Sequence, residues 1–142
     1  MLTHTKDELQ EHYLHLIGRT GADPGVLSIE RYSEELIVAR VEFDETNLRP
    51  GGVLSGPTLF SVVDSMGYLV TMSRAPKGSN GFTSALTMQF LRPAPVGPVR
   101  VEGRLLKFSK RASVIDTILY RDGLDGPVAQ GVVTYVPILP TS

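Results

Sequence analysis

The chain has 142 residues, of which 42% are hydrophobic and 20% charged, and its formal net charge is −1. These values are typical of one globular domain and exclude a disordered or low-complexity chain. The near balance of charge argues against a nucleic-acid binder that works by neutralising phosphates. The absence of cysteine excludes disulfides, thiolate metal ligands and a cysteine nucleophile.

The N-terminal segment is predicted to form a helix over residues 5–17. Leu9 and Tyr13 recur at helical spacing, and Thr5 with Glu8 fits a capping box. The first residues lack the basic start and apolar run of a signal peptide, and no stretch approaches the ~20 apolar residues of a membrane span. We therefore expect a cytoplasmic protein with no membrane span.

All three histidines, His4, His12 and His15, lie in this N-terminal segment. A histidine-based triad or a zinc site would have to recruit it. With no cysteine and no clustered acids nearby, we expect no metal site, and we expect surface or packing roles for these side chains.

Two strands are predicted next, over residues 26–32 and 36–43, and a loop rich in glycine and proline follows over residues 47–54. In the second strand, apolar and polar residues alternate. This period of two is typical of a strand with one face in the core.

A long apolar helix is predicted over residues 58–75, after Ser55 as N-cap and Pro57. Its sequence is mostly uncharged, and Asp64 is the only charged residue between Ser55 and Ser73. We therefore expect the helix to be buried nearly all round.

From residue 82 onward the pattern is that of strands joined by short links. Four are predicted, over residues 82–91, 99–108, 112–121 and 128–136. Their order predicts an antiparallel meander. The whole chain, residues 1–142, is expected to be a single α+β domain in which one antiparallel sheet wraps the long helix and residues 1–22 form a peripheral helix.

Two features of the long helix are candidates for chemistry. A carboxylate such as Asp64 is costly within an apolar helix unless it is paired or hydrogen-bonded, and such a group is suited to act as a general base. Composition alone favours the alternative, in which Asp64 has a structural role or reaches solvent. The helix N-terminus at Gly56 offers N–H groups to an oxyanion, although an ordinary helix cap is the commoner meaning of such a sequence.

Gly56 and Asp64 are eight residues apart, which is roughly 12 Å along one helix. They cannot both touch one reacting atom within a single chain. If both act on one substrate, two copies of the helix must meet, which predicts a symmetric dimer with active sites at its interface.

The stretch over residues 47–68, NLRPGGVLSGPTLFSVVDSMGY, resembles the helix-entry motif of hotdog-fold acyl-CoA thioesterases, in the PaaI-like (phenylacetate-degradation) branch. That branch usually carries His-Gly-Gly before the helix and an aspartate nine residues after the histidine. Here residues 55–57 are Ser-Gly-Pro and Asp64 stands at the aspartate position. The proline removes one N–H donor and leaves those of Gly56 and Thr58.

The later strands also look like those of this family. Residues 83–94 resemble the strand that ends in a proline, and residues 101–120 and 128–136 resemble the last strands, so that the likeness covers roughly residues 25–137. It implies a hotdog fold, with about six antiparallel strands around a long central helix.

The resemblance also implies catalytic residues. Asp64 would activate water or attack the thioester carbonyl itself, and the Gly56 N–H of the other subunit would bind the thioester oxygen. Thr83, or Ser84 as the alternative, would orient the water or the aspartate. Ser55 stands where relatives often use the motif histidine to orient the thioester or water.

Substrate-binding residues follow from the same resemblance. An apolar side chain would hold the acyl group, and basic side chains could bind the phosphates of coenzyme A. The alternative is that the basic side chains are ordinary solvated charges at the end of a strand. The set comprises Arg49, Phe82, Ser84, Arg92, Lys107, Ser109, Lys110 and Arg111. No cofactor is expected, because coenzyme A is part of the substrate.

Three functions remain open at this point. The first is an acyl-CoA thioesterase that acts on an acyl- or aryl-acyl-CoA. The second is a hotdog protein that binds acyl-CoA without hydrolysing it, which the changes at Ser55 and Pro57 motivate. A hydratase or dehydratase ranks last, because such enzymes usually pair an acid with a histidine. We expect a homodimer, paired further into a tetramer because one sheet face is uncovered.

Overall fold

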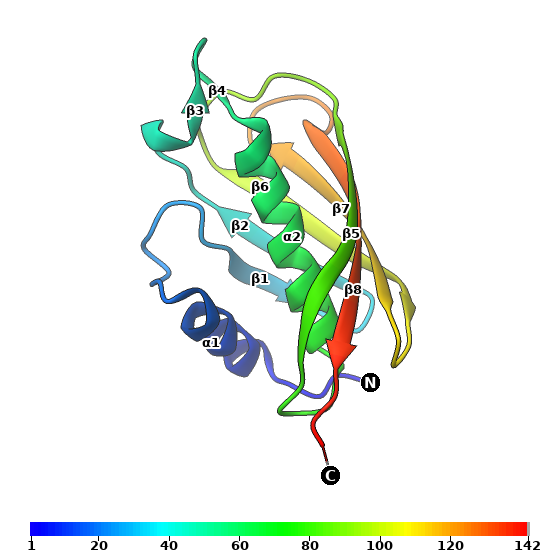
Figure 1. The fold of residues 1–142 in the computed structure, drawn as a ribbon. Helices are drawn as coiled ribbons and strands as arrows, with labels where there is room; N and C mark the ends of the chain where they lie inside the picture. The colour runs from blue at the N-terminus through cyan, green and yellow to red at the C-terminus, as the bar shows by residue number, and fades with distance from the viewer. Residues whose placement is uncertain (142) are drawn as a thin grey trace.

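A six-stranded antiparallel sheet curves around one long helix (Figure 1). The computed structural model describes residues 1–141. The helices are α1 (Lys6–Ile17) and α2 (Gly56–Met72), and the sheet contains β1 (Ser28–Tyr32), β2 (Leu36–Val41), β5 (Asn80–Phe90), β6 (Val99–Phe108), β7 (Ser113–Arg121) and β8 (Ala129–Ile138). The predicted α+β architecture is confirmed.

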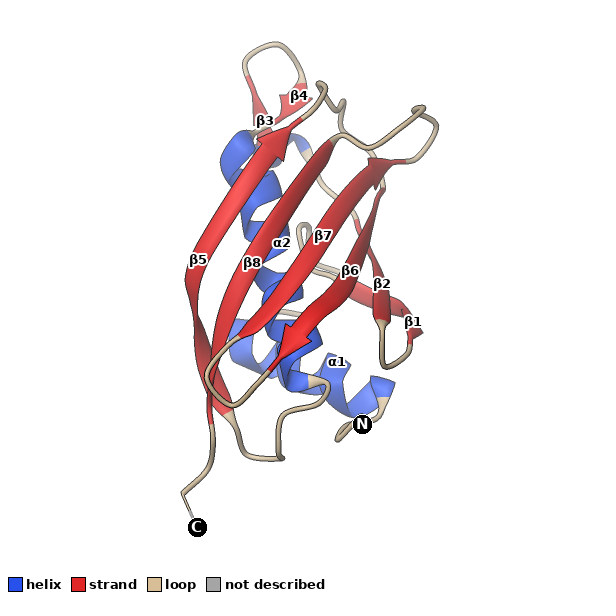
Figure 2. Cartoon of the chain, turned by 90° about the vertical axis from the view of Figure 1, so that its right-hand side faces the viewer, coloured by secondary structure: helices blue, strands red, loops and turns tan. Residues whose placement is uncertain are grey.

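The order of strands in the sheet is β1-β2-β6-β7-β8-β5, which corrects one part of the prediction. The last four strands are not a simple meander, because β5 pairs with β8 and not with β6, the next strand along the chain. Both edges of β6 are occupied by β2 and β7. The link over residues 91–98 therefore crosses between distant strands, and β5 is left at an edge of the sheet (Figure 2).

The loop predicted over residues 47–54 contains a small hairpin. A 3₁₀ turn (Glu45–Asn47) leads into β3 (Leu48–Arg49), and β4 (Val53–Leu54) pairs with it in antiparallel fashion. Gly51 and Gly52 form the tip with φ of 105° and 77°, a backbone conformation that favours glycine. The hairpin stands at the N-terminal end of α2 (Figure 1).

Helix α2 is exposed along one face of its N-terminal half, so the prediction of burial nearly all round holds only for its C-terminal half. Its core face carries residues such as Val63, Met66 and Leu69, each fully buried. The opposite face is exposed at Pro57, Phe60, Ser61 and Asp64. The sheet covers one side of the helix, and α1 lies beside its C-terminal half (Figure 1).

Glycines let α2 approach the sheet closely. A Cβ at Gly67 would lie 2.9 Å from both Cγ methyls of Val133 on β8, and a Cβ at Gly131 would lie 2.9 Å from a methyl of Val63. Each distance is shorter than carbon atoms tolerate. The helix therefore sits at a spacing that only glycine allows at these positions.

Gly67→Leu is expected to lower the free energy of unfolding by about 2–3 kcal/mol, because it overpacks this contact. Chemical denaturation measures the change. Gly21→Leu is the matched control: a Cβ there meets nothing within 4 Å, and its φ is not positive. That control is expected to stay within about 0.5 kcal/mol of the unchanged protein. Equal effects of the two substitutions would contradict the close helix–sheet contact.

The N-terminal segment is held against the body of the molecule. The predicted capping box of α1 is confirmed, since the Glu8 N–H donates to Thr5 Oγ1 and the Thr5 N–H donates to Glu8 Oε1. His4 is buried, and its carbonyl accepts a hydrogen bond from Tyr32 Oη at 2.8 Å. Tyr13 is also buried in the core. Within residues 1–141, no helix is both long enough and apolar enough to span a membrane.

Candidate functional site

The first turn of α2 leaves one backbone N–H without a partner. Ser55 caps the helix: its Oγ accepts the Thr58 N–H at 3.2 Å, and its carbonyl accepts the Leu59 N–H at 3.2 Å. Pro57 has no N–H. Within residues 1–141, the Gly56 N–H therefore stays unpaired and carries the positive end of the helix dipole. The expectation that the Thr58 N–H is also available was wrong, because the cap uses it.

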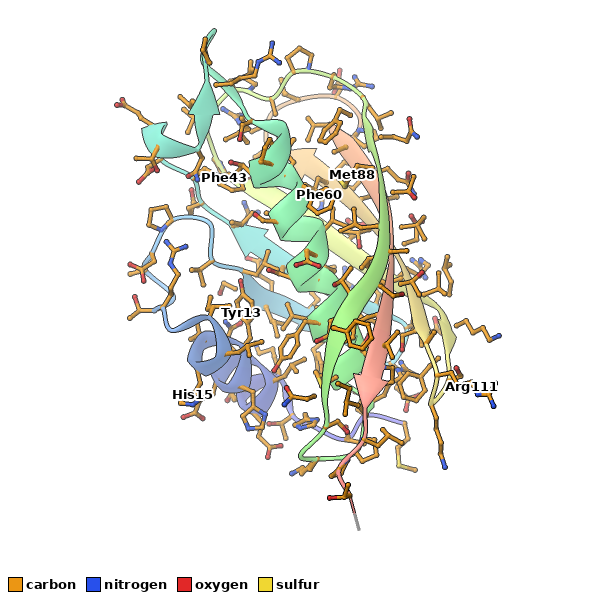
Figure 3. The ribbon with its side chains drawn as sticks, viewed as in Figure 1. Tyr13, His15, Phe43, Phe60, Met88 and Arg111 are labelled. Atoms are coloured by element: carbon orange, nitrogen blue, oxygen red, sulfur yellow. The ribbon has the colours of Figure 1, made fainter. Side chains whose placement is uncertain are left out.

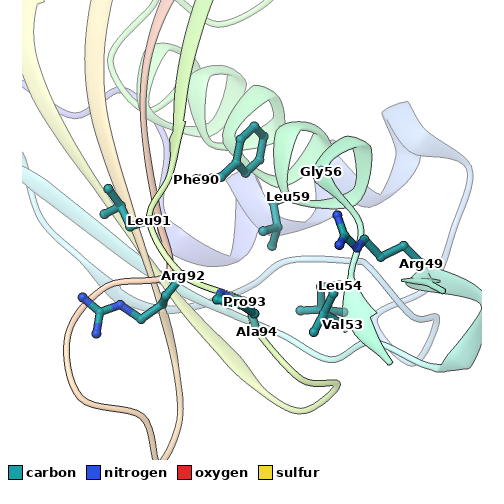
Figure 4. A pocket seen from close by; sticks show the side chains of 10 residues that line it. All are labelled: Arg49, Val53, Leu54, Gly56, Leu59, Phe90, Leu91, Arg92, Pro93 and Ala94. Atoms are coloured by element: carbon teal, nitrogen blue, oxygen red, sulfur yellow. The ribbon is translucent and has the colours of Figure 1, made fainter. Parts of the chain in front are cut away.

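A hollow of about 410 Å³ opens beside Gly56 (Figure 4). Arg49 from β3 and Phe90 from the end of β5 line it, and Phe90 Cζ would lie 3.5 Å from a Cβ placed at Gly56. Arg92 also lines the hollow, but its guanidinium donates to the Asp125 carbonyl at 2.8 Å and points away from Gly56 (Figure 4). Arg49 is thus the cation nearest this helix end among the lining residues.

Asp64 lies in the middle of α2 and faces the start of β5. Thr83 Oγ1 donates a hydrogen bond of 2.5 Å to Asp64 Oδ1. Ser84, the alternative partner, donates instead to the Thr134 carbonyl at 3.4 Å. The register of β5 shifts between Thr83 and Ala85. Such a bulge changes which neighbouring side chain faces the helix, and here it is Thr83 that does so.

A second hollow, of about 290 Å³, surrounds Asp64 and Thr83. It lies between α1, α2 and the start of β5. Its remaining walls are apolar or aromatic except for Ser65 and are formed by Tyr13, Leu16, Ile17, Ser65, Tyr68, Gly81, Phe82 and Tyr135. Phe82, predicted to hold an acyl group, is thus in the same hollow as Asp64.

The sequence analysis missed the three tyrosines of this hollow. Tyr68 lies between the other two, with ring centroids 6.4 Å from Tyr13 and 6.3 Å from Tyr135. Burial, with smaller contributions from Tyr68 and Asp64, raises the pKa of Tyr135 to about 12. Its hydroxyl therefore remains protonated at neutral pH and can donate a hydrogen bond. The spacing of Tyr68, one turn after Asp64, is the signal that could have identified it.

Gly81 makes room for the ring of Tyr135. A Cβ at Gly81 would lie 2.4 Å from Tyr135 Cε1 and 2.6 Å from the Val136 carbonyl oxygen. The ring of Tyr135 therefore passes over the backbone of β5 at the edge of the hollow. A larger residue than glycine would push the ring away.

The basic residues predicted to bind coenzyme A do not form one cluster within a chain. Lys107, Lys110 and Arg111 are exposed at the β6–β7 hairpin. Ser109 shapes that turn, since its Oγ accepts the Arg111 N–H at 3.2 Å. Arg92 lies beyond the opposite end of β6, a strand of ten residues that spans about 33 Å.

Gly56 and Asp64 face two hollows that share no lining residue. Eight residues of helix separate them, about 12 Å at 1.5 Å per residue. Among the described residues, each chain therefore presents two different polar groups at two separate places: an unpaired amide N–H at one, and a hydrogen-bonded carboxylate at the other.

Comparison with known proteins identifies the family. The profile of the Thioesterase superfamily matches residues 51–127. The chain belongs to the thioesterase superfamily. A protein of Saccharolobus solfataricus, named as a candidate esterase, is 31% identical over 127 residues, which are 89% of this chain and 78% of that protein.

Solved structures of thioesterases share the fold. A candidate thioesterase from Silicibacter sp. TM1040 has a TM-score of 0.85 at 28% identity, over 99% of this chain and 95% of that one. A hypothetical thioesterase from Streptococcus pneumoniae TIGR4, solved with coenzyme A, has a TM-score of 0.77 at 17% identity, over 94% of this chain and 99% of that one. The predicted hotdog fold is confirmed.

Proposed function

We propose that this thioesterase-superfamily protein hydrolyses an acyl-CoA thioester to a free acid and coenzyme A. The observation that carries the proposal is the Asp64 carboxylate, held by Thr83 in a hollow with mainly apolar and aromatic walls. The coenzyme A found with the Streptococcus pneumoniae structure supports this substrate class. The proposal includes membership of the PaaI-like branch, whose helix-entry motif the sequence around Asp64 resembles.

In the proposed reaction, Asp64 acts as general base. It removes a proton from a water molecule while the water oxygen bonds to the thioester carbonyl carbon. The carbonyl oxygen becomes negative and is stabilised by the Gly56 N–H, at the positive end of the helix dipole. The tetrahedral intermediate then breaks its carbon–sulfur bond, and the leaving thiolate takes the proton from Asp64.

Thr83 supports either role of Asp64. Its hydroxyl donates a hydrogen bond to Asp64 Oδ1, so that Oδ2 can accept a proton from water. In the alternative route, Oδ2 attacks the carbonyl directly and expels the thiolate; water then hydrolyses the resulting anhydride. Both routes need the carboxylate and the oxyanion donor at one carbonyl group.

The separation of Gly56 from Asp64 supports a homodimer in which each active site takes one group from each subunit. The edge of β5 carries no neighbouring strand within residues 1–141. Phe60, Phe82 and Phe90, on α2 and β5, are 44%, 52% and 56% exposed. Exposed aromatic residues beside an open strand edge mark an association surface. We also propose that two such dimers pair through the uncovered outer face of the sheet to form a tetramer.

Contacts to coenzyme A are proposed for two basic regions. Arg49 stands beside the Gly56 hollow, and the β6–β7 hairpin presents Lys107, Lys110 and Arg111. In a dimer the second region can come from the partner subunit. Cations at such positions attract the phosphates of the substrate and leave the neutral acyl part to enter the protein.

Thr83→Val is expected to lower kcat by about 10- to 100-fold, because Asp64 loses the donor that fixes its orientation. KM for acyl-CoA should change little. Thr83→Ser keeps the hydroxyl and should restore most of the rate. Thr87→Val, an exposed site on the same strand, is the matched control. If both valine variants retain full activity, Thr83 does not position Asp64.

The function is tested by measuring thiol release from short, medium, long and aromatic acyl-CoAs. The chain contains no cysteine, so it adds no background to a thiol-reactive dye. Turnover of at least one class is expected. The second candidate function, binding without hydrolysis, is favoured by the use of Ser55 as a helix cap, which leaves no side chain in the role of the motif histidine. It predicts no thiol release but stabilisation by about 2.7 kcal/mol at 100 Kd of ligand.

A further inference from the structure

The N-terminal helix contributes to the hollow around Asp64. Tyr13, Leu16 and Ile17 of α1 all line it. Figure 3 shows the labelled Tyr13 on the side of α1 that faces α2. The segment is anchored there by Tyr32 Oη, which donates to the His4 carbonyl, and by Gln10, whose Nε2 donates to the Leu27 carbonyl at 3.0 Å.

A third hollow, of about 230 Å³, adjoins the one around Asp64. His4, His12, His15 and Met72 line it. Two residues, Leu16 of α1 and Tyr68 of α2, line both hollows. They form the wall that the two hollows share.

The acyl part of the substrate is the part that fits the hollow around Asp64. Among the described residues, Asp64 is the only charged one that lines this hollow. A carboxylate repels the phosphates of coenzyme A, whereas the walls of Leu16, Tyr68 and Phe82 suit an uncharged hydrocarbon group. This step depends on the proposed function, which brings the thioester carbonyl to Asp64.

The hollow around Asp64 is also small. Its volume of about 290 Å³ is just below the range of about 300–1,000 Å³ that is typical of ligand pockets. We propose that Leu16 and Tyr68 set the acyl-chain length of this protein by closing the Asp64 hollow, and that the histidine-lined hollow behind them admits a longer chain when the wall is opened.

The surroundings of the wall support this assignment. Burial and the neighbouring His12 lower the pKa of His4, which keeps it uncharged at neutral pH. The side chain of Leu16 is 57% exposed, so shortening it leaves the core intact. Tyr68 packs near Tyr13 and Tyr135 next to Asp64, so changing it would also disturb the surroundings of the carboxylate. Leu16 is therefore the residue to change.

The test compares kcat/KM over a series of straight-chain substrates from acetyl- to dodecanoyl-CoA. Leu16→Ala should extend the accepted chain, with about a fourfold gain in kcat/KM for each further methylene buried. Leu16→Phe should shift the preference to shorter chains. Leu124→Ala is the matched control, because this leucine is 38% exposed in the turn between β7 and β8 and lines neither hollow. Its profile should equal that of the unchanged protein.

Two failures are distinguishable. If the unchanged protein hydrolyses acyl-CoA and Leu16→Ala gives the same chain-length profile, the wall does not control length and the inference is overturned. If no variant releases thiol, the proposed function fails, and the dissociation constants of the same substrates, measured by calorimetry, test the wall. A shift of tightest binding to longer chains in Leu16→Ala supports the inference, and unchanged constants overturn it.

Discussion

Asp64→Asn is expected to reduce the rate of thioester hydrolysis by about 10²–10⁴-fold, the contribution of a positioned general base. The amide oxygen can still accept the hydrogen bond from Thr83. An amide does not take a proton from water at neutral pH and does not attack a carbonyl, so both proposed routes are blocked. Thiol release under saturating substrate measures the loss.

A matched control separates this loss from damage to the fold. Asp116 is another hydrogen-bonded carboxylate, which accepts from Gln130 Nε2 at 2.6 Å on the sheet. Asp116→Asn should keep the rate of the unchanged protein, and both variants should unfold at nearly the same temperature. An Asp64→Asn variant with full activity would remove Asp64 from the mechanism.

Gly56→Pro is expected to lower kcat by about 10²–10³-fold, because it deletes the single unpaired N–H that is proposed to bind the oxyanion. Proline is well tolerated at the first position of a helix. Ser55 before it has φ −74° and ψ 153°, an extended conformation that suits a residue preceding proline. Residue 56 also precedes Pro57, whose ring disfavours a helical residue that carries a Cβ. Any substitution at this position shares that strain, so an alanine variant measures its effect.

Gly56→Ala is the matched control for this substitution. Alanine keeps the N–H, and its Cβ would lie 3.5 Å from Phe90 Cζ, an ordinary van der Waals distance. Its kcat should remain within severalfold of the original. If the proline variant also keeps its rate, the oxyanion is stabilised elsewhere.

Mixing the two inactive variants tests whether each active site is shared between subunits. In a dimer of one Asp64→Asn chain and one Gly56→Pro chain, one site has both defects and the other has neither. Random exchange makes half of the dimers mixed, so activity should return to about a quarter of the original. Failure to recover any activity, with mixed dimers demonstrated by mass, would contradict the shared site.

Local sequence patterns predicted the elements of this fold well. Thr5 and Glu8 identified the start of α1, Ser55 and Pro57 identified the start of α2, and the bounds of β6 agree with the prediction. These features depend on residues close together in the chain, whose spacing and hydrogen-bonding groups are visible in the sequence. The same local spacing selected Asp64 and Gly56 as candidates. It also showed that the two groups of one chain are too far apart to touch the same reacting atom.

Contacts between distant segments had to come from the tertiary structure. The pairing of β5 with β8, the exposed face of α2 at Asp64, and the position of Arg92 away from the other basic residues all depend on how the sheet curves. A shift in the register of β5 decided between Thr83 and Ser84 as the partner of Asp64.

By itself, then, the sequence determined both helices and the six long strands, and it selected one carboxylate and one amide as candidates for chemistry, because those properties arise within a few residues. Only the tertiary structure decided what surrounds them. Tyr135 reaches the hollow around Asp64 from β8, and Leu16 reaches it from a helix about 50 residues earlier in the chain. Packing between such segments depends on strand order and side-chain volume over the whole domain, which no local pattern encodes.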